Sequence, residues 1–301
     1  MPALAGSQQG LDFAAKLFID EGTPMVTEAP TYVAALQVFE LFGADLHTVP
    51  LTAEGPDLGL LEKTLDRHRP RCIYLIPCFQ NPSGACYAEE NRAAIAELLD
   101  HYEITLIEDE PYRSLSLQAD RPMTPISSLL RRANWLYLGS FSKILWPGWR
   151  LGYLAASPAL MPHLVRLKQA ADLHTQRPGQ LAVAHWLKSA DRGRDLERLK
   201  NGYRIRRDAM QAALERHFGD IADWETPQGG LFFWLHLRGL QARRAELDRA
   251  LEQNVAFMPG EAFYPAQATG QTTMRLNYSR STPEEMETGL SILASSLKEA
   301  R

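Results

Sequence analysis

The chain has 301 residues, of which 45% are hydrophobic and 23% are charged, and its net charge is −4 at pH 7. A chain of this length exceeds the usual size of one hydrophobic core, so a large domain with a smaller one is expected. The small negative charge favours neither nucleic-acid nor membrane-surface binding, no apolar run reaches membrane-spanning length, and the sequence predicts no secretory signal.

Short apolar runs alternate with helical patterns over residues 1–190. The runs predict buried strands at Met25–Thr27, Leu46–Val49, Cys72–Ile76, Thr105–Ile107, Trp135–Leu138 and Leu151–Ala155. Helices are predicted between them at Leu11–Asp20, Thr31–Phe42, Leu58–Arg67 and Glu89–His101. This alternation indicates an α/β fold with a mainly parallel sheet covered by helices, in which ligands bind at the carboxyl ends of the strands.

The pattern changes near residue 190, which predicts a large domain at 1–190 and a smaller C-terminal α+β domain at 191–301. The expected elements of the smaller domain are a long helix at Arg192–His217, a strand at Leu231–Leu237, a helix at Ala242–Glu252, strands at Val255–Met258 and Thr273–Asn277, and a last helix from Pro283. Residues 3–6 run almost directly into the first helix, so we expect an abbreviated first strand and a missing N-terminal segment.

The segment 140–152 contains a lysine among phosphate-binding side chains. Lys143 directly follows Ser142, and Ser140 and Arg150 lie nearby in the sequence. Such a lysine can form an imine with an aldehyde, while the hydroxyls and the guanidinium can hold a phosphate. Pyridoxal 5'-phosphate (PLP) carries both groups and is the electron sink of amino-acid chemistry. The segment therefore predicts a PLP site.

Other polar residues follow predicted strands or precede a helix. Ser7 sits where a loop turns into a helix, which suits a phosphate but also an ordinary helix cap. Asp109 follows a strand and can pair with a pyridine nitrogen, and Tyr112 can bond the phenolic oxygen of the ring. The alternative for these two is an acidic turn beside a packed tyrosine.

Two further residues complete the pattern. Asn81 lies in an Asn-Pro-Ser-Gly turn and presents an amide donor, although Asn-Pro turns are also common without function. Tyr32 follows the strand that ends at Thr27, where its ring either stacks on a pyridine or belongs to the core. Few other cofactors need a stacking ring, an amide, an acid with a tyrosine, and a lysine with an arginine at consecutive strand ends.

With these motifs the sequence resembles the class I aminotransferases of PLP fold type I across nearly the whole chain. The matching segments are 6–9 (Gly-Ser-Gln-Gln), 29–32 (Ala-Pro-Thr-Tyr), 81–84 (Asn-Pro-Ser-Gly), 109–112 (Asp-Glu-Pro-Tyr), 140–143 (Ser-Phe-Ser-Lys), 147–150 (Pro-Gly-Trp-Arg) and 275–279 (Arg-Leu-Asn-Tyr-Ser). Their order and spacing both agree with the family.

The resemblance implies a role for each matching residue. Lys143 would be the Schiff-base lysine and proton shuttle, and Tyr32 would stack on the ring. Asp109 would pair with the ring nitrogen, with Asn81 and Tyr112 on the phenolic oxygen. The phosphate would be held by Ser7, Gln8, Ser140, Ser142 and Arg150. Arg275 would clamp the substrate α-carboxylate, for which its planar two-pronged donor is suited; without the resemblance it would be a surface charge.

Segments 168–175 and 252–260 resemble the branch that contains 2-aminoadipate, kynurenine and aromatic aminotransferases. Members often use 2-oxoglutarate or glutamate as one partner, and they are homodimers with shared active sites. Arg177 lies in a segment that can reach the neighbouring site, where it would bind an acidic side chain; a surface or capping role is the alternative. The missing N-terminal segment would normally include part of the substrate gate.

The expected function is thus a ping-pong transfer of an amino group between an L-amino acid and a 2-oxo acid. Three alternatives stay open: another PLP reaction such as β-elimination or decarboxylation, a PLP-binding sensor domain, and a truncated inactive aminotransferase. The three cysteines, Cys72, Cys78 and Cys86, match neither a zinc nor a redox motif. They predict reduced thiols, a cytoplasmic location and no metal site.

Overall fold

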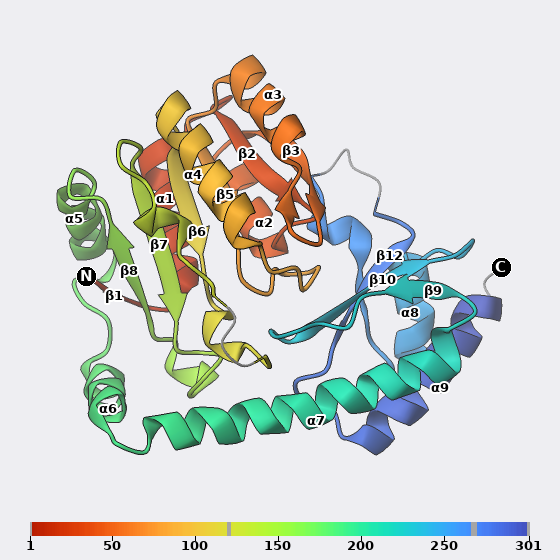
Figure 1. Ribbon diagram of the computed structural model, residues 1–301. Helices are drawn as coiled ribbons and strands as arrows, with labels where there is room; N and C mark the ends of the chain where they lie inside the picture. Colours follow the sequence, from red (N-terminus) through yellow and green to blue (C-terminus); the bar gives the residue numbers. More distant parts are fainter. Residues whose placement is uncertain (1, 119–121, 266–269, 300–301) are drawn as a thin grey trace.

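The larger part of the protein is an α/β unit built on an eight-stranded sheet (Figure 1). The computed structural model describes residues 2–118, 122–265 and 270–299. The strands are β1 (Ala3–Leu4), β2 (Pro24–Ala29), β3 (Asp45–Thr52), β4 (Gly55–Pro56), β5 (Cys72–Leu75), β6 (Thr105–Asp109), β7 (Trp135–Ser140) and β8 (Gly152–Ala156). They lie in the order β1-β8-β7-β6-β5-β2-β3-β4.

Strands β3, β2, β5, β6 and β7 are parallel, and only the outer strands β1, β8 and β4 run antiparallel to their neighbours within the described parts of this sheet. The predicted mainly parallel sheet is therefore confirmed. Because side chains alternate across a strand, β5 contributes to a core on each face of the sheet. Tyr74 packs on one side and Ile73 on the other.

Helices cover both faces of this sheet. The core on one face includes side chains of α1 (Ser7–Phe18), α2 (Val33–Leu41) and α5 (Met161–Asp172). The core on the opposite face includes side chains of α3 (Leu58–His68) and α4 (Glu89–Tyr102). Two such layers cover both faces of a parallel sheet, and the central strands β5 and β6 are fully buried.

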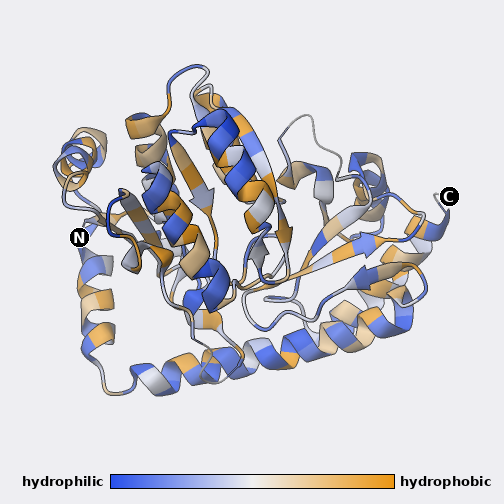
Figure 2. Cartoon of the chain, turned by 45° about the horizontal axis from the view of Figure 1, so that its top comes forward, coloured by the Kyte–Doolittle hydropathy of each residue, from blue (hydrophilic) through white to orange (hydrophobic). Residues whose placement is uncertain are grey.

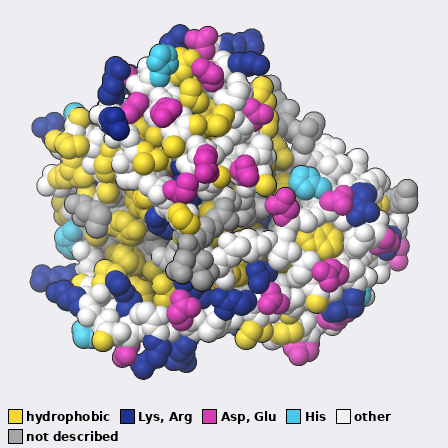
Figure 3. Space-filling view, viewed as in Figure 1, with side chains coloured by type: hydrophobic (Ala, Val, Ile, Leu, Met, Phe, Trp, Pro, Cys, Tyr) yellow, Lys and Arg dark blue, Asp and Glu magenta, His cyan; other side chains and the backbone are white. Residues whose placement is uncertain are grey.

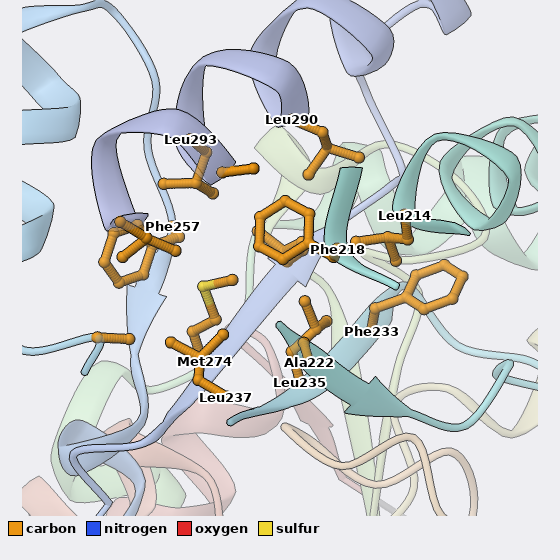
Figure 4. Close-up of a cluster of buried hydrophobic side chains, with 14 of the residues drawn as sticks. Leu214, Phe218, Ala222, Phe233, Leu235, Leu237, Phe257, Met274, Leu290 and Leu293 are labelled. Atoms are coloured by element: carbon orange, nitrogen blue, oxygen red, sulfur yellow. The ribbon is translucent and has the colours of Figure 1, made fainter. Parts of the chain in front are cut away.

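A smaller antiparallel sheet lies beside the first and has the order β11-β12-β10-β9. Its elements are β9 (Ala222–Trp224), β10 (Phe232–Leu237), α8 (Arg244–Glu252), β11 (Met258–Pro259), β12 (Thr273–Asn277) and α9 (Pro283–Glu299). Its core combines Phe233 and Met274 from the strands with Phe218 from α7 (Arg192–Phe218) and Leu290 and Leu293 from α9 (Figure 4).

The long helix α7 (Arg192–Phe218) passes beneath both sheets and follows the shorter α6 (Arg177–Lys188) (Figure 1). Most of its residues are hydrophilic (Figure 2), and Lys and Arg side chains lie over it on the surface (Figure 3).

The predicted domain boundary near residue 190 stays a prediction, although the two sheets lie on either side of it in the sequence. Among the described residues, no helix is both long enough and apolar enough to span a membrane.

Several predicted element boundaries were wrong. The first helix begins at Ser7, four residues before the prediction, because Gly6 occupies the cap position and the turn leads straight into the helix. The strand expected at Val255–Met258 pairs only at Met258–Pro259, where β12 offers it a partner. Helices α5 and α6 were not predicted, whereas the abbreviated first strand is present as the two-residue β1.

Candidate active site

A cavity of about 440 Å³ lies at the carboxyl ends of the parallel strands β2, β5, β6 and β7. These four strands are neighbours in the sheet, so the loops that follow them converge at one edge. All the side chains predicted to contact the cofactor line this cavity. They are Ser7, Gln8, Tyr32, Asn81, Asp109, Tyr112, Ser140, Ser142, Lys143 and Arg150.

Lys143 stands in the turn after β7, with its Nζ 5.8 Å from the centre of the Tyr112 ring. Burial lowers the pKa of this amine, and the positive charges of Arg150 and Arg275 lower it further, while Asp109 acts in the opposite direction. A lowered pKa increases the fraction of neutral amine near neutral pH. Lys143 is therefore suited to act as a nucleophile or a base.

Asp109 is the last residue of β6 and is only 2% exposed. Its Oδ2 accepts a hydrogen bond of 2.9 Å from the Tyr74 hydroxyl, whereas its buried Oδ1 has no hydrogen-bond partner among the described residues. Burial raises the pKa of Asp109 to about 7, and the nearby Glu28 carboxyl also raises it. A buried carboxylate with one unsatisfied oxygen suits a cationic donor from a ligand.

The turn before α1 also contributes to the cavity, which Ser7 and Gln8 line. The first turn of a helix leaves backbone N–H groups without an intrahelical acceptor, and these attract anions. Gly6 has φ 81°, and a Cβ at this position would lie 2.6 Å from Nη2 of Arg150. Only glycine thus lets the guanidinium approach the turn. Arg150 also donates a hydrogen bond of 3.2 Å to the Ser142 hydroxyl.

Tyr32 and Gln8 both line the cavity and are hydrogen-bonded to each other. The Tyr32 hydroxyl donates a long hydrogen bond of 3.4 Å to Oε1 of Gln8, which links the start of α2 to the start of α1. Tyr112 and Asn81, the two residues assigned to the phenolic oxygen of the ring, both line the cavity. Ser7 occupies the first position of α1 rather than the cap position, which belongs to Gly6.

Arg275 comes from the smaller sheet and reaches the same site. Its Nη1 donates a hydrogen bond of 2.7 Å to Oδ1 of Asn81, while its Nε is buried without a partner among the described residues. The guanidinium lies over the Phe232 ring at 4.1 Å and near the Phe263 ring at 5.0 Å. Two aromatic neighbours and a hydrogen bond fix its plane, and its unsatisfied N–H suits a carboxylate.

The sequence reasoning missed the buried residues that support this site. Tyr74 holds Asp109, and the fully buried Glu28 accepts hydrogen bonds from the backbone of Ile76 and from the side chains of Gln80 and Tyr87. Burial raises the pKa of Glu28 above its usual value. One sequence signal could have indicated Tyr74. Its hydroxyl group lies inside the otherwise apolar run 72–76, where a buried hydroxyl needs a hydrogen-bond partner.

Two groups of candidate residues lie away from the cavity. Arg177 is exposed at the start of α6 and does not line the cavity, so its proposed contact with a neighbouring subunit stays a prediction. Cys72, Cys78 and Cys86 are all buried, and burial raises the pKa of Cys72 to about 12. No cluster suited to a metal ion is found within the described parts of the chain.

The donor set fits PLP. The unsatisfied Asp109 oxygen matches the protonated ring nitrogen, and the helix start with Arg150 and Ser142 matches the phosphate. Lys143, the residue expected to bind the aldehyde, lines the same cavity. The sequence model of the family "Aminotransferase class I and II" matches residues 3–293 of this chain.

The chain belongs to the class I and II aminotransferases. It is thus a member of a PLP-dependent enzyme family with PLP fold type I. It is 41% identical to a 2-aminoadipate transaminase of Thermus thermophilus, over 97% of this chain and 74% of the relative. It is 36% identical to aromatic-amino-acid aminotransferase 1 of Thermococcus litoralis, over 98% of this chain and 72% of that protein.

A solved structure and a second kind of relative extend the comparison. LysN, an α-aminoadipate aminotransferase from Thermus thermophilus crystallised with N-(5'-phosphopyridoxyl)-L-leucine, superposes with a TM-score of 0.92 at 39% identity, covering 99% of this chain and 76% of LysN. An uncharacterised helix-turn-helix-type transcriptional regulator of Bacillus subtilis is 30% identical over 97% of this chain and 59% of its own length.

Proposed function

We propose that this aminotransferase moves the amino group of an L-amino acid of the 2-aminoadipate, glutamate or aromatic type to a 2-oxo acid such as 2-oxoglutarate. The observation that carries the proposal is the cavity that joins Lys143, Asp109 and the phosphate-binding turn, with Arg275 reaching it through Asn81. The similarity to enzymes named for 2-aminoadipate and aromatic amino acids supports the choice of substrates. We further propose a homodimer in the cytoplasm.

Bound PLP supplies an aldehyde that takes up the amino group and a ring that withdraws electrons from it. We assign to Lys143 Nζ the removal of the proton from the substrate α-carbon and its transfer to the cofactor carbon that carried the aldehyde. Its lowered pKa favours this role, because a base must give up its own proton before it can accept one. Asp109 holds the ring nitrogen in its protonated form, since a buried carboxylate stabilises a cation beside it.

Arg275 binds and orients the substrate through its α-carboxylate. Its Nε is unsatisfied and its plane is fixed by Asn81 and Phe232, so the carboxylate meets a donor that is already positioned. Because Arg275 comes from β12 and Asn81 from the loop after β5, a bound carboxylate bridges the two sheets. Substrate binding would thereby exclude water from the region around Lys143.

A second candidate function is a PLP-binding sensor domain without turnover. The similarity to a helix-turn-helix-type regulator favours it, because that relative contains the same region in a longer protein. The complete set of side chains around Lys143 favours the enzyme instead, since a sensor needs to bind the cofactor but does not need both a base and a carboxylate clamp.

The test is an absorbance spectrum of the purified protein with PLP, before and after addition of glutamate or 2-aminoadipate. Conversion of bound PLP to pyridoxamine phosphate, with release of the matching 2-oxo acid, is the expected result. Lys143→Ala should abolish this conversion, while Lys298→Ala, which removes an exposed ion pair with Asp220, should leave it unchanged. Bound PLP that no amino acid converts would favour the sensor, and ammonia or carbon dioxide as product would favour another PLP reaction.

A further inference from the structure

A nearly buried lysine lies close to the phosphate end of the site without lining the cavity. Lys168, on α5, has a side chain that is 8% exposed. Its Nζ donates hydrogen bonds to three oxygens: Oε1 of Gln9 at 2.9 Å, Oδ2 of Asp172 at 2.7 Å and Oγ1 of Thr175 at 2.7 Å. All three donors of the ammonium are therefore used.

The same acceptors hold the chain on both sides of the turn before α1. Oε1 of Gln9 also accepts from the backbone N–H of Ala5 at 3.0 Å, and Nε2 of Gln9 donates to Asp172 at 3.0 Å. The Thr175 hydroxyl donates to the carbonyl oxygen of Ala3 at 3.0 Å. One ammonium thus connects α5 to residues 3, 5 and 9.

This turn carries the phosphate end of the cavity. Ser7 and Gln8 line the cavity and directly precede Gln9, while Gly6 lies against the Arg150 guanidinium. Binding groups need placement within about 0.5 Å, and neighbouring residues that do not touch the ligand supply that precision. A shift of the turn would move the helix start away from Arg150.

We propose that Lys168, together with Asp172 and Thr175, is a positioning residue that holds the turn at residues 3–6 and the start of α1 in the geometry that binds the cofactor phosphate. The proposal rests on the assignment of PLP to this cavity. It also gives a physical role to the segment 168–175, because its first, fifth and eighth residues form the network.

The test compares the dissociation constants of PLP and of pyridoxal, which lacks the phosphate, measured by tryptophan fluorescence in the apo protein. In Lys168→Met the PLP dissociation constant should rise about tenfold, equivalent to about 1.4 kcal/mol. The pyridoxal constant should stay within about twofold, because the ring end of the site is unchanged. Asp172 retains 30% exposure, so water can solvate its carboxylate once Lys168 is removed.

Two variants guard against a general loss of structure. Thr175→Val removes one hydroxyl at nearly constant shape and should weaken PLP binding about threefold, which is half the free-energy effect of Lys168→Met. Lys16→Met on α1 removes an exposed ion pair with Asp12 and should change neither constant. Urea unfolding of each apo variant reports stability separately.

Three outcomes are decisive. A selective loss of PLP affinity in Lys168→Met and Thr175→Val supports the positioning role. Unchanged PLP affinity in both, or an equal loss for PLP and pyridoxal, would overturn it while leaving the cofactor assignment intact. Absence of PLP binding by the unaltered protein would overturn the cofactor assignment, and this proposal with it.

Discussion

Asp109→Asn should make the apo protein more stable at pH 8 while weakening its response to PLP. Asp109 is buried, its Oδ2 accepts one hydrogen bond from Tyr74, and its Oδ1 accepts none from the described residues. An ionised carboxylate in this position is poorly compensated until a cation arrives. Asparagine keeps the shape and the acceptor for Tyr74 but removes the charge.

The magnitude follows from the pKa of Asp109, which burial raises from 3.8 to about 7. Between these two pH values the unfolded chain has released the proton and the folded chain still holds it, so the free energy of unfolding falls as pH rises. Each pH unit contributes about 1.4 kcal/mol, which gives a penalty of about 4 kcal/mol above pH 7. An unsatisfied amide N–H₂ offsets about 1–3 kcal/mol of this, so the net gain for asparagine at pH 8 is about 1–3 kcal/mol.

The cofactor should reduce the stability advantage of the variant. Loss of a charge-assisted hydrogen bond to the ring nitrogen costs about 1.5–3 kcal/mol, so the dissociation constant of PLP should rise at least about tenfold. The stabilisation that PLP gives at a hundredfold excess over its dissociation constant is about 2.7 kcal/mol, and the variant should lose about half of it or more at the same concentration.

The assay is urea unfolding of both proteins with and without PLP, at pH 8 and at pH 5. The advantage of the apo variant should shrink at pH 5, because Asp109 is then protonated in the folded protein. An apo variant that unfolds at the same or lower urea concentration than the unaltered protein at pH 8 would refute the burial argument. Equal stabilisation of both proteins by PLP would refute the pairing of Asp109 with the ring.

Three other substitutions test separate parts of the site. Arg275→Lys should raise KM for amino-acid substrates about tenfold or more, because an ammonium cannot replace the two-pronged donor; an unchanged KM in steady-state kinetics would exclude the clamp. Tyr74→Phe removes the hydrogen bond that lowers the pKa of Asp109, so the decline of PLP affinity on acidification should begin at a higher pH, as a titration of binding against pH would reveal. Phe232→Leu should raise KM without changing PLP affinity, since the ring packs on Arg275; loss of both would contradict this division.

The sequence alone determined the fold class and the chemistry of the cavity. Strand-length apolar runs such as 72–76 alternate with helical patterns, which requires a parallel sheet with helices on both faces. Polar residues that end such strands must meet at one edge, so the order of strands and loops along the chain was enough to place Tyr32, Asn81, Asp109 and Lys143 together. The helix start at Ser7 was placed too late because Gly6 is not a strong capping signal.

The tertiary structure decided the contacts that join segments distant in sequence. Arg275 and Asn81 are separated by 194 residues, and no local pattern encodes their hydrogen bond. Lys168 reaches Gln9 across 159 residues in the same way. Local spacing can specify which residues share a strand end or a helix face, but pairings between elements depend on how the whole sheet is ordered and packed. The raised pKa of Asp109 likewise results from burial, which only the folded chain provides.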